Sequence, residues 1–263
     1  MNWYRCVFSM CFVAGLVLGR GVFAEEQSTQ IKTEQGSEGA SYEELKTQHE
    51  ESYKKAEDLR EDGEYDAAFD IMRRLADESP DVRYKIACID VILDQTKALK
   101  DANNPMWRIK AKEAKSRIEL LKGFAAGNAY YFLVWSRYSW IVGARRDKHI
   151  YGALEKAFSY KPNYLEAFIL KGDIYLDLAR NAARADQPQD KRSFSDTARA
   201  SYDAALANPE ITDKKKAYVL LRLGELEDHI LGNKAAAKAD WEKAISAAPG
   251  SRAGEQAKKL LNQ

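Results

Sequence analysis

The sequence predicts an all-α protein, built as a solenoid of antiparallel helix pairs and closed by a capping helix at the C-terminus. Three observations predict this fold. From Tyr42 onward the apolar residues recur every three or four positions, as on one face of a helix. No long stretch alternates between apolar and polar residues, as a half-buried strand does. A small residue, a turn and a closing proline recur around Pro80, Pro162 and Pro249, so we expect about ten to twelve helices.

Residues 1–24 have the features of an export signal. Arg5 supplies a positive charge, and an apolar run follows over residues 6–19. Small residues at 22 and 24 then allow cleavage before Glu25. The run is shorter than the ~20 apolar residues that span a bilayer. We therefore expect an exported, periplasmic protein with no stable membrane insertion after cleavage.

A lipoprotein is the alternative, with the lipid on Cys11. The apolar run continues after this cysteine, whereas lipidation requires the run to precede it. The sequence therefore favours a cleaved signal without a lipid anchor. Next comes a polar, aromatic-free stretch over residues 25–41, which we expect to be a flexible spacer before the solenoid at 42–263.

Charge argues against a nucleic-acid-binding protein, and cysteine content argues against a fold held by disulfides. The chain has 41 basic and 40 acidic residues, and residues 1–24 hold two of the basic ones, so the cleaved chain carries a net charge of −1. No field of that size attracts nucleic acid. Cys88 is the one cysteine after the signal, so the cleaved chain forms no internal disulfide. Its stability must come from the apolar core.

The clearest repeated unit spans residues 217–251. In its first helix, Gly224 stands where a partner helix must come close. Gly232 and Asn233 form the turn, and Pro249 ends the unit. The second helix places three residues on its inner face: Ala237, Trp241 and Ala244. We expect Trp241 and Ala244 to be buried against the first helix.

Similar units recur upstream. The clearest lie near residues 49–82, 129–162, 165–209 and 217–250. Each resembles the tetratricopeptide repeat (TPR), a helix-turn-helix unit of about 34 residues. The unit at 165–209 departs from the pattern at Lys171, where the repeat usually has leucine. Residues 81–127 are expected to form a degenerate repeat, and 251–261 a capping helix with a polar outer face.

The stretch NAYYFLVWSRYSW at residues 128–140 is rich in aromatic residues. Helical spacing makes it the first helix of a divergent repeat. Four of its aromatic residues are expected to pack against neighbouring helices: Tyr131, Phe132, Trp135 and Tyr138. The strip formed by Tyr130, Arg137 and Trp140 is expected to face the groove. Arg137 is then expected to lie against the ring of Trp140, one turn away.

No motif in the sequence predicts catalysis. Phosphate-binding loops, nucleophile elbows and zinc motifs are missing, and the three histidines, His49, His149 and His229, stand far apart. Cys88 lies in an apolar run and is expected to be buried and unreactive. The sequence therefore predicts no enzyme activity, no cofactor and no metal site.

The TPR resemblance implies a concave groove lined by the first helix of each pair, with a protein or peptide as its partner. The residues then expected to contact the partner are Tyr130, Arg137, Trp140, Glu166, Asp173, Asp177, Tyr218, Glu225 and Asp228. Their acids favour a partner segment that carries Lys or Arg beside an apolar anchor. The alternative is a periplasmic small-ligand or transporter-accessory binding protein. A through-going or closed aromatic cavity favours the small ligand, and an open groove favours the peptide.

Overall fold

The computed structural model describes residues 42–124, 126–143 and 147–263, which belong to one compact unit at 41–263. This part of the chain is all-α, as predicted. Its helices are α1 (Tyr42–Asp62), α2 (Tyr65–Glu78), α3 (Val82–Asp101), α4 (Trp107–Leu121), α5 (Ala129–Ile141), α6 (Asp147–Tyr160), α7 (Leu165–Arg184), α8 (Pro188–Leu206), α9 (Asp213–Leu226), α10 (Lys234–Ala247) and α11 (Arg252–Leu261). A π-helical turn, η1 (Glu227–Leu231), continues α9.

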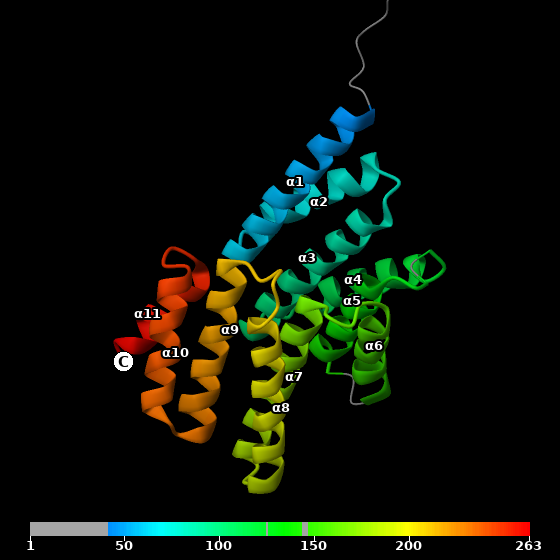
Figure 1. Ribbon diagram of the computed structural model, residues 1–263. Coiled ribbons are helices and arrows are strands. Elements are labelled where there is room, and N and C mark those ends of the chain that lie inside the picture. Colours follow the sequence, from blue (N-terminus) through cyan, green and yellow to red (C-terminus); the bar gives the residue numbers. More distant parts are fainter. Residues whose placement is uncertain (1–41, 125, 144–146) are drawn as a thin grey trace, which may run out of the picture. The chain divides into compact units, whose positions relative to one another are not determined.

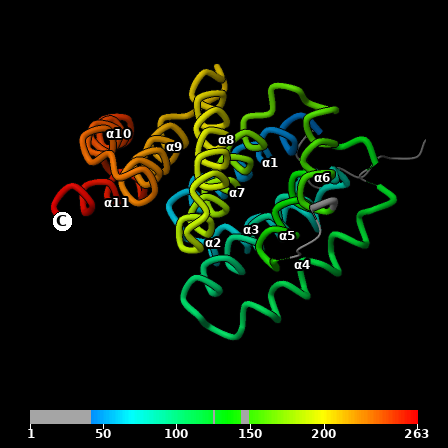
Figure 2. Tube along the Cα trace, turned by 90° about the horizontal axis from the view of Figure 1, so that it is seen from below, coloured from blue at the N-terminus to red at the C-terminus, as the bar shows by residue number. Residues whose placement is uncertain are grey.

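Consecutive helices pack as pairs: α1 with α2, α3 with α4, α5 with α6, α7 with α8, and α9 with α10. The last helix, α11, packs on both α10 and α9, as a capping helix does. In both views α7 and α8 stand between the group α9–α11 and the group α3–α6 (Figures 1 and 2). Five apolar clusters run through the array, so each pair shares core with its neighbours.

Side chains near the turns fix where several helices begin. The Asn128 side chain accepts hydrogen bonds from the backbone N–H groups of Tyr130 and Tyr131 at the start of α5. Thr212 and Ser251 similarly cap α9 and α11. These oxygens satisfy N–H groups that have no partner inside the helix. The predicted breaks between helices thus have a local chemical cause.

Two glycines allow the closest contacts between paired helices. A Cβ atom at Gly224 would lie 2.2 Å from Nε1 of Trp241, and one at Gly172 would lie 2.3 Å from Cε1 of Tyr202. Only glycine fits at such distances. Trp241 is 7% exposed and Ala244 is fully buried, so the packing predicted for this repeat is confirmed.

The aromatic helix α5 is mainly core. Tyr131 is buried, and its ring stacks with that of Trp135 at a centroid distance of 6.5 Å. Phe132, Trp135 and Tyr138 are half-buried against the cluster that joins α3, α4 and α5. The prediction that these four aromatic residues pack against flanking helices is confirmed. The neighbouring helix α3 has eleven buried residues, although its repeat is the least recognisable in the sequence.

The expected export signal (1–24, with Cys11) and the expected spacer (25–41) lie outside the described residues. None of the helices in the described part is long and apolar enough to cross a membrane.

Candidate functional site

A central cavity of about 870 Å³ lies among the first helices of the pairs. Its wall takes side chains from α1, α3, α5, α7, α9 and α11. The wall includes nine basic and seven acidic side chains together with six aromatic ones. A volume of this size falls within the range of ligand pockets, ~300–1,000 Å³. The concave side of the array is therefore the candidate binding site.

Six of the nine residues expected at the groove line this cavity: Tyr130, Arg137, Trp140, Glu166, Asp173 and Tyr218. The other three, Asp177, Glu225 and Asp228, do not. Whether the six contact a partner stays a prediction.

A buried network of two arginines and two aspartates joins α1, α3 and α5. Arg60 Nη2 lies 2.7 Å from Asp90 Oδ2, and Arg137 Nη1 lies 2.5 Å from Asp90 Oδ1. Asp94 pairs with both arginines, and the Tyr130 hydroxyl donates to Asp90 at 3.2 Å. Burial alone would raise the pKa of Asp90, but Arg60 and Arg137 outweigh it and hold that pKa below its usual value.

This network corrects one expectation for Arg137. Its guanidinium does not lie against the ring of Trp140, because both of its ends bind the aspartates of α3. Lys97 takes that place, with Nζ 5.4 Å from the centroid of the Trp140 ring. Arg137 is thus a structural cation whose charge is already neutralised, and Trp140 keeps a cationic neighbour in the cavity wall.

A second network surrounds Asp173 of α7. Its carboxylate accepts hydrogen bonds from Tyr202 at 2.7 Å, Tyr218 at 2.8 Å and Arg222 at 3.1 Å. Burial, followed by the nearby Asp173 charge, raises the pKa of Tyr218 well above its usual value. The tyrosine hydroxyl thus stays protonated and acts as a donor that fixes Asp173 between α8 and α9.

Glu225 lies next to this network on α9. Its carboxylate pairs with Arg222 at 2.5 Å and with Arg180 at 2.8 Å. Asp173 and Glu225 are only 7% and 6% exposed. The expectation that these two acids stand on an exposed face is therefore wrong. A helical wheel describes one helix at a time, so it cannot show that arginines from two helices pair with these acids and cover them.

The three remaining acids of the expected groove are also paired. Glu166 contacts Lys215 at 2.8 Å. Asp177 contacts Arg180 at 3.3 Å, and Asp228 contacts His229 at 2.9 Å. The expected acidic surface is therefore largely neutralised, and the cavity wall has a mixed charge instead.

Contacts between the two ends of the array close one side of the cavity. They link α1 and α2 to α9 and α11, and consist of Lys214–Asp62 at 2.9 Å, Lys215–Glu61 at 4.0 Å and a hydrogen bond from Arg252 to the Tyr65 hydroxyl at 2.5 Å. We call these the closing contacts. They are made by long, partly exposed side chains, and salt weakens such ion pairs. The cavity is thus bounded by contacts that can separate without unfolding a helix.

We predict that salt separates these ends. Spin labels at exposed Lys55 of α1 and Lys216 of α9 would report the distance between them, and buried Cys88 would not take up the label. The share of long distances should rise with salt concentration. Replacing Lys214 and Lys215 by methionine should give the long distances already at low salt. A distance distribution that neither salt nor these substitutions alter would contradict this role.

The residues that hold the cavity wall together, Arg60, Asp90, Asp94 and Arg222, were not among the expected site residues. One signal in the sequence could have indicated them. Asp90 is the single charged residue in the apolar run 86–93, and Asp94 follows one turn later. Acids in such a run are almost never buried without a partner. The position of the cationic partners is set by the packing of α1 and α5 on α3.

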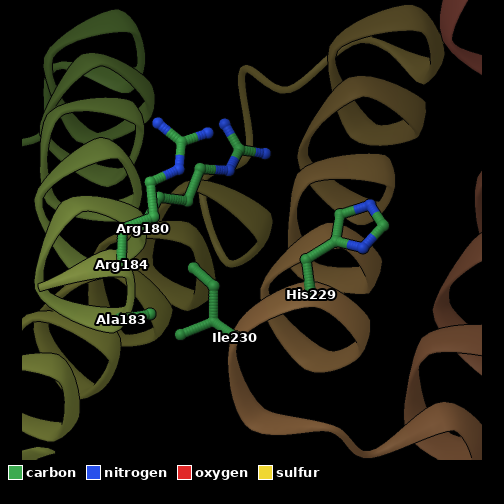
Figure 3. A pocket seen from close by; sticks show the side chains of 5 residues that line it. All are labelled: Arg180, Ala183, Arg184, His229 and Ile230. Carbon is green, nitrogen blue, oxygen red and sulfur yellow. The ribbon is translucent and has the colours of Figure 1, made fainter. Parts of the chain in front are cut away.

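A smaller depression of about 380 Å³ lies between α7 and η1 (Figure 3). Arg180 and Arg184 extend next to each other there, while the His229 ring stands on the neighbouring segment. Arg180 is already paired with two acids, and His229 contacts Asp228. This depression therefore offers a weaker site than the central cavity.

Reactive side chains do not gather in the described residues. No group of three or more His, Cys, Asp or Glu in this part of the chain has the geometry to hold a metal ion. Cys88 is buried, and burial raises the pKa of its thiol to about 11, so the nucleophilic thiolate is scarce near neutral pH.

Successive antiparallel helix pairs, with the first helices forming one wall and an added helix covering the last pair, define a TPR-like α-solenoid. The solved structure of TTC0263, a thermophilic TPR protein of Thermus thermophilus, is similar to this chain. The TM-score is 0.56 at 18% identity, over 82% of this chain and 100% of that one. No family model and no curated protein matches the sequence. The structural likeness confirms the predicted TPR-like fold.

Proposed function

We propose that this protein is an exported, non-catalytic binding protein that holds a short peptide segment of a partner protein in the central cavity. The observation that carries the proposal is the cavity itself, because the first helix of every pair contributes to one continuous wall. The TPR-like fold supports a role in protein interaction. The signal expected at residues 1–24 supports delivery to the periplasm.

The wall favours a ligand that carries both positive and negative groups. Basic and acidic side chains are interspersed around it, with tyrosines and Trp140 between them. A peptide segment offers both amide donors and acceptors, and its side chains can contact aromatic rings. Asp90 and Asp173, two buried carboxylates of the wall, are held by arginines in the manner of structural ion pairs. These contacts support binding rather than acid–base chemistry.

A small ligand is the second candidate. The closing contacts favour it, since they bound the cavity on the side where α1 approaches α9. A long peptide could not pass through that side while the contacts hold. For the first candidate, the same geometry favours the end of a polypeptide over an internal loop.

Photo-crosslinking in the native host tests both candidates. Benzoylphenylalanine replaces Trp140 in the cavity wall, or Lys238 on the exposed face of α10 as the matched control. We expect adducts from position 140 and none from 238. Peptide-containing adducts support the first candidate, and adducts of small added mass support the second.

A filled cavity provides the specificity control. Ala98 lines the wall, so Ala98→Trp should reduce the crosslinks from position 140 without unfolding the array. Equal crosslinking from positions 140 and 238, or crosslinks at 140 that survive Ala98→Trp, would show that the ligand does not occupy the cavity.

A further inference from the structure

The outer face of α4 and the turns at its two ends carry an exposed apolar strip that the central cavity does not use. Met106 is 50% exposed, Ile109 59%, Leu120 75% and Phe124 81%. These are four of the eight large exposed apolar side chains in the described residues. Exposed apolar residues gathered in this way mark interaction surfaces.

The strip has a simple helical origin. Ile109 and Leu120 are eleven positions apart, which is close to three whole turns, so they share one face. Ala111, Ala114 and Ile118 lie on the opposite face and are buried against α3. The helix therefore packs on α3 with one face and leaves Ile109 and Leu120 in solvent on the other.

Basic residues flank this strip. Between residues 104 and 124 six are basic and two acidic: Arg108, Lys110, Lys112, Lys115, Arg117 and Lys122 against Glu113 and Glu119. The whole chain has a formal net charge of only +1, so positive charge is concentrated here. Glu113 and Glu119 pair within α4, with Arg117 at 3.1 Å and Lys115 at 3.5 Å. Lys112 and Lys122 have no acidic partner among the described residues.

Half-buried aromatic side chains of α5 lie next to α4. Trp135 and Tyr138 pack against the apolar cluster that includes Ala114 and Ile118, with 6.2 Å between their ring centroids. Burial raises the pKa of Tyr138, and the charges of Lys115 and Glu119 act on it from α4. Tryptophan and tyrosine favour the boundary between water and lipid because their rings are apolar with one polar group.

We propose that α4 lies flat on the surface of a bilayer that contains anionic lipids. Ile109, Leu120 and Phe124 enter the headgroup region, and the flanking lysines contact lipid phosphates. An exposed apolar strip with lysine and arginine beside it is the signature of an interfacial helix. A second copy of the chain fits less well, because pairing two such faces would oppose two clusters of positive charge. The cavity lining comes from other helices, so bound lipid would leave it free.

Vesicle flotation tests this inference with residues 42–263, a unit that contains every described helix and all five apolar clusters. The unit should float with vesicles of equal parts phosphatidylglycerol and phosphatidylcholine, and much less with phosphatidylcholine alone. Binding should weaken as salt rises. Lys112→Gln and Lys122→Gln should each weaken it about fivefold, the share of one basic residue near an anionic surface.

The matched control makes the same charge change elsewhere. Lys258→Gln with Lys259→Gln alters two exposed lysines of α11 and should leave flotation unchanged. A dye on Leu120→Cys should shift to shorter emission wavelengths when anionic vesicles are added, while buried Cys88 stays unlabelled.

Three results would overturn the proposal. The first is no flotation with the anionic vesicles. The second is a loss of binding from Lys258→Gln with Lys259→Gln as large as that from Lys112→Gln with Lys122→Gln, which would indicate a nonspecific effect of charge. The third is a dimer that the Lys112 or Leu120 substitutions dissociate in sedimentation, since this face would then be an interface between copies.

Discussion

Replacing Trp241 by alanine is expected to lower the free energy of unfolding by about 3–5 kcal/mol, the range for deleting a large buried aromatic side chain. The indole ring covers Gly224 and belongs to the apolar cluster of α9, α10 and α11. Its N–H has no hydrogen-bond partner in the described residues, so the loss is one of packing. Urea unfolding of the variant and of the parent measures the difference.

A double-mutant cycle makes this prediction specific. Gly224→Ala alone should destabilise, since its Cβ would lie 2.2 Å from the indole. In the Trp241→Ala background the same change should cost much less, because the methyl group enters the space that the ring has left. Hydrogen exchange should show α9–α11 losing protection first, as repeats couple mainly to their neighbours. Additive effects, or a Trp241→Ala variant that unfolds like the parent, would contradict this packing.

Asp90→Asn is expected to cost about 3–5 kcal/mol, the range for removing one partner of a buried ion pair. The substitution keeps the shape of the side chain but removes one of the two carboxylates that bind Arg137, leaving it Asp94, while Arg60 keeps Asp94 and Glu57. The three helices that meet at this network should therefore separate more easily. Asp101→Asn is the matched control, because Asp101 is exposed and pairs only with Lys97 among the described residues; it should cost at most ~1 kcal/mol.

The difference in unfolding free energy between the parent and Asp90→Asn should change with pH in a definite direction. The folded pKa of Asp90 lies below its ordinary value of 3.8, so ionised Asp90 stabilises the fold above that pH. This contribution disappears as pH falls below 3.8 and through the folded pKa. The gap in unfolding free energy between parent and Asp90→Asn should be constant above about pH 5 and shrink in acid. A gap independent of pH would mean that Asp90 does not act through its charge.

The resemblance among the repeats located the concave wall, and with it Tyr130, Trp140 and Tyr218 in the cavity lining. It did not show that acids of this wall are buried and paired with cations. Asp173 lies on the inner face of α7 as the periodicity indicates, but the cation that neutralises it, Arg222, and the hydroxyl that donates to it, that of Tyr202, belong to other helices. Sequence spacing reports which residues share a face of one helix and not which side chains meet it from outside.

The sequence by itself determined the helices and their pairing. Apolar spacing, small residues such as Gly172 and Gly224, and the prolines act within one helix or between adjacent ones, so they can be read locally. Only the tertiary structure decided how the cavity is bounded. Lys214 and Asp62 are 152 positions apart in the chain and meet because small rotations between successive pairs bring the two ends of the array together. The total rotation along the array cannot be read from the sequence of any single repeat.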